Sequence, residues 1–307
     1  MLTMKVIKSQ SIITSLLLLC SITVISQNYR TYYRFINKAE LESVKLNHEK
    51  SICYYDSAFA LNPPLPGHLE DALREVLMNK DYQKCVNYLN NLVNEGVDVV
   101  EEVNSMENSE EFQVSSYYRD FIKDYNTRLA MSQVSFDTAS INLLKAMVIT
   151  DQQIRKTPHP KGDTSYYKEE REMDIHNFAL LKGIVEKKGW PNYKKVGRIY
   201  SGVANIVLLH GSRYYSLESK EWQFFEEILK KEIYAGNFNP ITLAQWTDQH
   251  LIMIEKKSQR YGSVANIEGE LFPIGNIDNI DVTRDKLLLE PLKDYMLKKG
   301  YSKILTQ

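Results

Sequence analysis

The chain has 307 residues, of which 43% are hydrophobic and 25% are charged, so neither a disordered chain nor a multi-span membrane protein is indicated. Its 38 Lys and Arg residues nearly balance its 39 Asp and Glu residues. This balance argues against nucleic acid as a partner, because binding nucleic acid requires a basic protein face.

Residues 1–26 have the pattern of a secretory signal peptide. Lys5 and Lys8 precede an apolar run, residues 12–25, which ends at the small residue Ser26. The run is shorter than the ~20 residues of a spanning helix, so an uncleaved membrane anchor is only the alternative. Lipidation of Cys20 is not expected, because the bulky Leu19 precedes it. The sequence therefore predicts an exported protein, periplasmic or extracellular, that meets a membrane only through an uncleaved signal.

Two cysteines remain after residue 26, and we expect both to stay reduced although export permits a disulfide. Cys85 lies on an apolar stripe of its helix, where a small buried thiol serves as a hydrophobic side chain. Cys53 lies off the stripe formed by Ile52, Tyr55 and Phe59, so it is not expected to face Cys85.

Residues 27–130 predict successive helices in antiparallel pairs. Within them, Ile52, Tyr55 and Ala58 before Pro63, and then residues 81–92, resemble the second helices of two degenerate tetratricopeptide repeats. The resemblance covers about two units and lacks most of the small residues of the first helices. It implies stacked helical hairpins and a surface that binds a protein or a peptide.

Two further segments complete this first module. Residues 101–111 are acidic and polar, and we expect a solvated connector there. Residues 112–129 predict one helix that closes the stack. A polar break at residues 132–140 then separates the module from a second helical domain, residues 131–307.

The second domain contains two helical patterns hinged on Gly189-Trp190-Pro191, where the glycine ends one helix and the proline prevents its continuation. The second pattern places one apolar stripe before His210, and its members are Val196, Ile199, Tyr200, Val203 and Val207. Further helices follow, and residues 259–280 are irregular or form a short hairpin with a strand at residues 271–274. The predicted fold is mainly α, with at most this short β-hairpin.

Four helices of the second domain carry polar residues on the face that is expected to be buried. These residues are Asp151 and Arg155, Asp174 and Asn177, His210, and Asp248. Burying a neutral polar group without a partner already costs roughly 2 to 7 kcal/mol, so the side chains should find one another. We expect one shared polar pocket. Its rim is expected to be formed by Tyr261, Ser263, Asp281 and Arg284.

Each member of this set also has a structural interpretation. Asp174 and Asp281 lie near helix starts and can serve as caps. His210 can be a satisfied core histidine. Asp151 and Arg155, four residues apart, can form a surface ion pair that stabilises a helix by only about 0.3 to 0.5 kcal/mol. The functional interpretation rests on the repetition of the pattern over four helices.

An ordered set of short motifs runs from about residue 140 to residue 298. It consists of DQxxR from Asp151, DxxN from Asp174, GWP from Gly189, VG from Val196, the helix ending at His210, Asp248, YGS from Tyr261, PI from Pro273 and DxxR from Asp281. The set resembles a bacterial domain family of unknown function. Leu209 and Gln249 depart from the glutamine and arginine of the family signatures, which implies an altered site if those positions belong to it. The resemblance implies no activity.

The chemistry of this residue set suits two roles. Asp174, His210 and Asp248 can bind a divalent metal and support hydrolysis of a phosphate or amide bond. Alternatively, Arg155 or Arg284 can clamp a carboxylate or phosphate of a small ligand. The HExxH, GxSxG, phosphate-loop and CxxC signatures are missing, and the sequence identifies no substrate, cofactor or metal.

Three functions therefore stay open from sequence. The second domain binds a small polar ligand or hydrolyses it, the N-terminal hairpins recruit a protein or peptide, or the polar set is a purely structural network.

Overall fold

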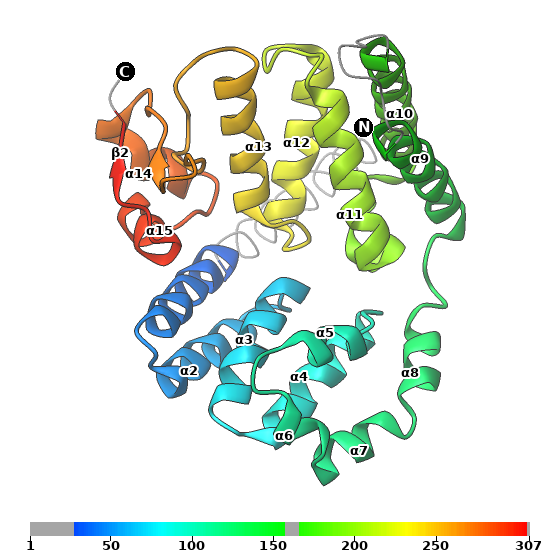
Figure 1. Ribbon diagram of the computed structural model, residues 1–307, viewed down its shortest axis with the longest axis vertical. Helices are drawn as coiled ribbons and strands as arrows, with labels where there is room; N and C mark the ends of the chain where they lie inside the picture. The colour runs from blue at the N-terminus through cyan, green and yellow to red at the C-terminus, as the bar shows by residue number, and fades with distance from the viewer. Residues whose placement is uncertain (1–27, 157–165, 306–307) are drawn as a thin grey trace, which may run out of the picture.

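The computed structural model of the protein describes residues 28–156 and 166–305, and these residues form a mainly α fold (Figure 1). The expected signal peptide, residues 1–26, lies outside the described residues. None of the helices within the described ranges is long and apolar enough to cross a membrane. Cys53 and Cys85 are both free, as expected, and burial raises the pKa of the Cys85 thiol to about 12.

The N-terminal module begins with a helix at residues 28–44, which packs beside three further helices of similar length. Those helices are α2 (His48–Phe59), α3 (Pro66–Met78) and α4 (Tyr82–Asn94), and α3 contacts both α2 and α4. Asp81 caps α4 by accepting a hydrogen bond from the Lys84 amide, which gives the helix its start. The expected succession of helices over this part of the chain is present.

Short helices complete the module, and two sequence expectations are wrong here. They are α5 (Val100–Ser105), α6 (Glu110–Gln113), α7 (Ser116–Ile122) and α8 (Tyr125–Ser132). The acidic stretch 101–111 is not only a connector, because α5 lies in it. The single helix expected over residues 112–129 is broken, because the Ser115 side chain accepts a hydrogen bond from the Tyr118 amide and starts a new helix.

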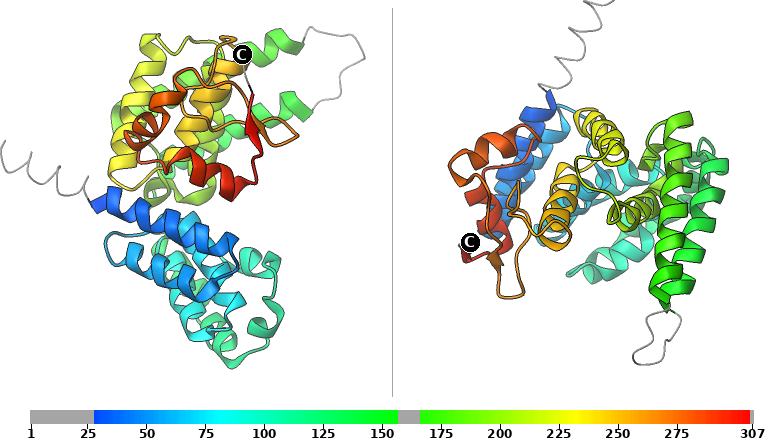
Figure 2. Two further views of the ribbon diagram at one scale, coloured as in Figure 1. Left: turned by 90° about the vertical axis from the view of Figure 1, so that its left-hand side faces the viewer. Right: turned by 90° about the horizontal axis from the view of Figure 1, so that it is seen from above.

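The C-terminal half is a second group of helices, which lies beside the first module in two views (Figures 1 and 2). It contains α9 (Thr138–Lys156), α10 (Tyr166–Lys188), α11 (Tyr193–Ser212), α12 (Lys220–Tyr234), α13 (Pro240–Met253), the 3-10 turn η1 (Ile277–Asn279), α14 (Ile280–Asp285) and α15 (Leu292–Lys299). Helices α9, α10 and α11 all contact one another. This three-helix contact positions most of the residues singled out by the sequence pattern.

The small sheet differs from the expected hairpin in its partner strand. Strand β1 (Glu270–Leu271) pairs in parallel with β2 (Lys303–Ile304), which follows α15 near the end of the chain. Within residues 259–280 there is an isolated antiparallel bridge between Ala265 and Leu271. The sequence pattern of residues 259–280 could not show that residues 303–304, which are distant in sequence, pair with β1.

The hinge between α10 and α11 forms as expected. Gly189 has a φ of 73°, the left-handed conformation typical of the residue after a helix end. Trp190 is completely buried and meets Phe225 and Phe238 edge to face, at centroid distances of 6.3 and 5.9 Å. The hinge therefore fixes α10 and α11 to the helices that follow.

Helix α11 is kinked at Gly197, which has φ 75° and ψ 165°. The expected stripe from Val196 to His210 is wrong at Ile199, which is 75% exposed, whereas Val196, Val203 and Val207 are buried. The kink resets the helical register, because residues before and after Gly197 belong to two helical segments. A Cβ atom at Gly197 would lie 2.9 Å from the Phe136 ring, so a glycine is also required for space.

The two halves meet along a polar seam and share one hydrophobic core, which includes Tyr29 from the first helix and Leu289 near the end of the chain. Asn37 donates a hydrogen bond of 2.8 Å to Asp294. Arg198 of α11 forms an ion pair with Glu70 of α3. The seam is thus a fixed part of the fold.

We predict that Gly197→Ala destabilises the protein. The φ and ψ of Gly197 lie in a region essentially restricted to glycine, so we expect a loss of about 1–3 kcal/mol in the free energy of unfolding. Gly202→Ala in the same helix is the matched control, because an added Cβ there meets nothing within 4 Å and should be neutral or stabilising by about 0.5–1 kcal/mol. Urea unfolding of both variants measures the difference, and equal stabilities would contradict the prediction.

We predict that Glu70 makes the protein less stable as the pH rises through neutrality. Burial, only partly offset by Arg198, raises the pKa of Glu70 from 4.5 to about 7. The folded state then holds the proton more tightly than the unfolded state, so the contribution of Glu70 is complete below about pH 4.5 and is lost as the pH rises past 7. Thermal unfolding from pH 5 to 8 should show a flatter profile for Glu70→Gln, and an unchanged profile would refute this assignment.

Candidate functional site

The polar residues expected in one pocket form two separate groups. Asp151, Arg155, Asp174 and His210 meet between α9, α10 and α11. Asp248 instead binds the loop that follows α13. Helices α11 and α12 lie between α13 and the pair of α9 and α10 in Figure 1. The expectation of a single pocket is therefore wrong, although buried polar side chains do find partners in both groups.

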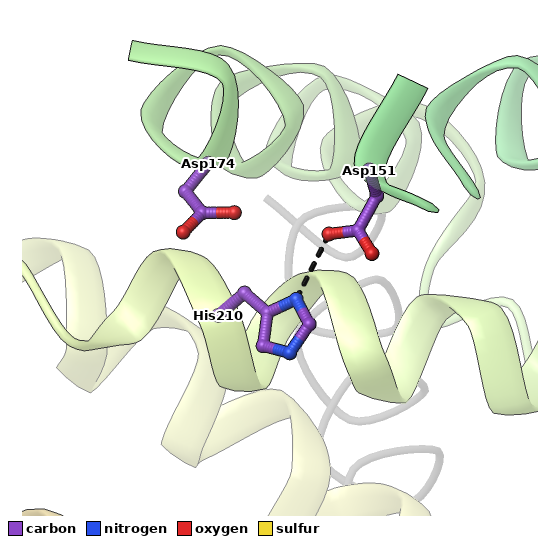
Figure 3. Close-up of side chains that lie close together, drawn as sticks. All are labelled: Asp151, Asp174 and His210. Atoms are coloured by element: carbon purple, nitrogen blue, oxygen red, sulfur yellow. Dashed lines mark hydrogen bonds and ion pairs between the residues drawn. The ribbon is translucent and has the colours of Figure 1, made fainter. Parts of the chain in front are cut away.

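The first group brings three helices together (Figure 3). The Asp151 carboxylate on α9 lies 2.9 Å from Nδ1 of His210 on α11. Arg155, one turn after Asp151, donates to Asp151 Oδ1 at 2.7 Å and to both oxygens of Asp174 on α10, at 2.8 and 2.9 Å. Asp151 and Asp174 are both buried. These four residues are called the Asp-His-Arg cluster below.

Both terminal nitrogens of the Arg155 guanidinium are engaged by acids. Besides Asp151 and Asp174, it lies 3.2 Å from Glu170. The three carboxylates carry three negative charges and the guanidinium carries one positive charge. Two negative charges therefore remain when the His210 imidazole is neutral. Arg155 is therefore not available to clamp an anionic ligand, and the negative excess favours a cation.

The electrostatics of Asp151 support an ionised carboxylate. Burial raises its pKa, but the hydrogen bond and charge of His210, together with Arg155 and Gln152, outweigh burial and lower the pKa below its ordinary value. Because Nδ1 of His210 is held by Asp151, the other ring nitrogen, Nε2, is directed away from that carboxylate (Figure 3). A carboxylate that orients an imidazole in this way is typical of metal-ligating and catalytic histidines.

Two structural interpretations from sequence are wrong for this cluster. Asp174 lies well inside α10 and does not cap it. Asp151 and Arg155 do not form a surface pair, because the Asp151 side chain is only 2% exposed. Asn177 lies one turn from Asp174 and donates to the Met147 carbonyl at 3.4 Å and to Met173 Sδ at 3.1 Å. Asn177 therefore links α10 to α9 and does not contact the cluster.

Two members of the surroundings were missed from sequence. Glu170 lies four residues before Asp174, and the Tyr214 hydroxyl donates to Asp174 at 3.3 Å from four residues after His210. Glu170 is spaced four residues from Asp174, and Tyr214 is spaced four residues from His210. The same helical spacing argument could therefore have found both. In α10 many charged residues surround Glu170, so it did not stand out as a buried polar position.

The cluster has the composition of a metal site. One ligand atom each from Asp151, Asp174 and His210 lie within 4.8 Å of one another. Carboxylate oxygens and an imidazole nitrogen are ligands for zinc, manganese and other divalent cations. The Arg155 guanidinium occupies the position between the two carboxylates, so a cation must displace it or bind beside it.

Asp248 has a different role, because its partners are the backbone amides of the next loop. Its carboxylate accepts hydrogen bonds from the amides of Arg260, Tyr261 and Ser263, at 2.7, 3.0 and 2.9 Å, and from the Ser263 hydroxyl at 2.7 Å. Asp248 is completely buried, and burial raises its pKa although these hydrogen bonds lower it. The carboxylate anchors the loop and presents no oxygen to solvent.

Arg284 and Asp281 hold the same region together. Arg284 is completely buried, donates to the carbonyls of Tyr261 and Glu290, each at 2.6 Å, and lies over the Tyr295 ring at 4.8 Å. Asp281 accepts a hydrogen bond of 2.7 Å from the Leu292 amide, the first residue of α15. Asp281 is therefore a cap, but of the following helix and not of its own. Tyr261, Ser263 and Arg284 form a loop anchor, not the rim of a ligand pocket.

Comparison of the chain with protein-family models, with curated proteins and with solved structures finds no match. The function is therefore inferred from the geometry of the polar residues alone. The two departures from the family signatures lie outside both groups of contacts: Leu209 packs against the hydrophobic core and Gln249 is exposed on α13.

We predict that Asp248→Ala destabilises the protein by about 3–5 kcal/mol, the usual result of breaking a buried charged network, because several amide donors then lose their acceptor. Denaturant unfolding measures the loss. Asp281→Ala, which removes one exposed cap, should cost about 0.5–2 kcal/mol. A loss for Asp248→Ala no larger than that for Asp281→Ala would contradict the anchoring role.

Proposed function

We propose that this is an exported protein whose C-terminal helical domain binds a divalent cation at the Asp-His-Arg cluster and uses it to bind or hydrolyse a small polar ligand. The observation that supports the proposal is the meeting of two buried carboxylates and an oriented imidazole from three helices, with three acids around a single arginine. A negative excess held in a buried place is costly unless a cation relieves it.

The proposed residues have distinct roles. Asp174 and Asp151 supply carboxylate oxygens, and His210 supplies an imidazole nitrogen that lies within 4.8 Å of both; a cation bound there takes the place of the hydrogen bond between His210 and Asp151. A bound cation lowers the pKa of a coordinated water and polarises the phosphoryl or acyl oxygen of a substrate, which is the chemistry of metal-assisted hydrolysis. Arg155 competes with the cation for the same carboxylates and so sets the affinity of the site.

A second candidate is a purely structural network, and the pairing of both terminal nitrogens of Arg155 with Asp151 and Asp174 favours it. In that case the cluster fixes the register of α9, α10 and α11 and binds nothing. Membership of the bacterial domain family, export, and recruitment of a protein or peptide by the N-terminal hairpins stay predictions from sequence.

The two candidates predict opposite effects of Arg155→Gln. For a cation site, removal of the competing guanidinium should raise the affinity for Zn²⁺ or Mn²⁺ by at least tenfold, and the unfolding temperature of the variant should rise when the ion is added, because a ligand of the native state stabilises it. Asp174→Asn and His210→Ala should each weaken binding by a similar factor. Calorimetric titration of the chain from residue 27 measures the affinities.

Asp120→Asn is the matched control, because Asp120 is exposed and pairs only with Lys123 in the part of the chain that the structure describes. The structural network is the correct interpretation if none of the variants binds Mg²⁺, Mn²⁺, Zn²⁺ or Ca²⁺ while Asp174→Ala and Arg155→Gln both lower the unfolding temperature.

A further inference from the structure

A cleft of about 320 Å³ lies on the seam between the two halves of the protein, apart from the Asp-His-Arg cluster. One wall is the helix at residues 28–44 together with α3, and the other is the start of α13 and the segment from residue 288 through α15. The side chains that line the cleft include Tyr33, Asn37, Glu40, His68, Asp71 and Lys298. A space of this size accommodates a small organic molecule.

Two polar atoms in the wall of the cleft are buried without a hydrogen-bond partner among the described residues. They are the Tyr33 hydroxyl and Oδ1 of Asn37, whose amide nitrogen donates to Asp294 at 2.8 Å. An unsatisfied buried polar atom costs about 1–3 kcal/mol, so two of them at one cleft call for an explanation. Both can accept a hydrogen bond, which points to an occupant that donates hydrogen bonds.

The acids that line the cleft exceed the bases by a single charge, with Glu40, Asp71, Glu75 and Glu290 against Arg74, Lys298 and Lys299. Lys298 is shared between Glu40 and Glu290, the second at 3.0 Å, so one ammonium serves two carboxylates. Burial raises the pKa of Glu40 although Lys298 lowers it. Asp71 pairs with Arg74 at 2.6 Å, and burial raises the pKa of Asp71 although Arg74 and Lys299 lower it. A further positive charge near these buried carboxylates would stabilise their ionised form.

His68 adds no positive charge at neutral pH. It is almost completely buried in α3, and its Nδ1 lies 2.7 Å from the Tyr32 hydroxyl. Burial, followed by the charge of Lys298, lowers the pKa of His68 to about 4. The imidazole is therefore neutral and contributes hydrogen bonding without compensating the acids.

We infer that this cleft is a second binding site, for a small molecule that carries a primary ammonium group. The ammonium lies against Asp71 and Glu40, and its three N–H donors satisfy acceptors such as Oδ1 of Asn37 and the Tyr33 hydroxyl. A phosphate or carboxylate ligand is disfavoured by the same acids. Because both halves of the protein line the cleft, the bound amine contacts both of them.

The test uses the chain from residue 27 and matched pairs of small probes. Putrescine and ethanolamine carry ammonium groups, whereas butanediol and ethylene glycol have the same size without the charge, and acetate carries the opposite charge. We expect the amines alone to raise the unfolding temperature and to bind in calorimetric titration. Asp71→Asn should weaken amine binding at least tenfold, while Asp120→Asn, an exposed acid elsewhere, should leave it unchanged.

Tyr33→Phe keeps the test informative if Asp71→Asn folds poorly. It removes an oxygen that has no protein partner, so the variant should be as stable as the parent or more stable without ligand and should bind the amine several-fold more weakly. Asp174→Asn must leave amine binding intact, which separates this site from the cation site. Equal binding of amines and their uncharged counterparts, or undiminished amine binding by both Asp71→Asn and Tyr33→Phe, overturns the inference.

Discussion

The arrangement of the C-terminal helices depends on how buried carboxylates are neutralised. Arg155 reaches from α9 to Asp174 on α10 while it also binds Asp151, and Asp151 in turn binds His210 on α11. One guanidinium and one imidazole thus connect three helices. Such a network is favourable only when nearly every hydrogen-bonding position is used, which is why its geometry is so specific.

The same requirement explains why the polar residues divide into two groups. Asp248 finds its donors in the backbone amides from Arg260 to Ser263, because a loop that turns at Gly262, with a φ of 65°, directs successive amides towards one carboxylate. These amides, together with the Ser263 hydroxyl, satisfy the Asp248 carboxylate within the loop. It therefore does not join the group formed by Asp151 and Asp174.

Sequence patterns revealed which residues need partners but not which partners they find. The helical spacing correctly indicated that Asp151 and Asp174 are buried, because a side chain on the apolar face of a helix must be satisfied inside the protein, whereas the His210 side chain is 15% exposed. The sequence analysis placed Tyr261 and Ser263 near Asp248, and both do contact it. That backbone amides supply most of these hydrogen bonds could not be predicted, since backbone amides have no residue code. The cleft on the seam was also invisible, because Asn37 and Asp71 are far in sequence from the segments that face them.

Gly197 shows how a single backbone angle connects the fold to the site. The segment before it is tied to the linker between the two halves, because the Asp137 amide donates to the Lys195 carbonyl at 2.7 Å. The segment after it buries Val203 and Val207 and turns His210 towards Asp151 on α9. In an unbroken helix each residue turns the chain by a constant angle, so the orientation of the segment before Gly197 would determine the orientation of the segment after it. The positive φ of Gly197 removes that constraint, so the linker and His210 can each be positioned by their own contacts.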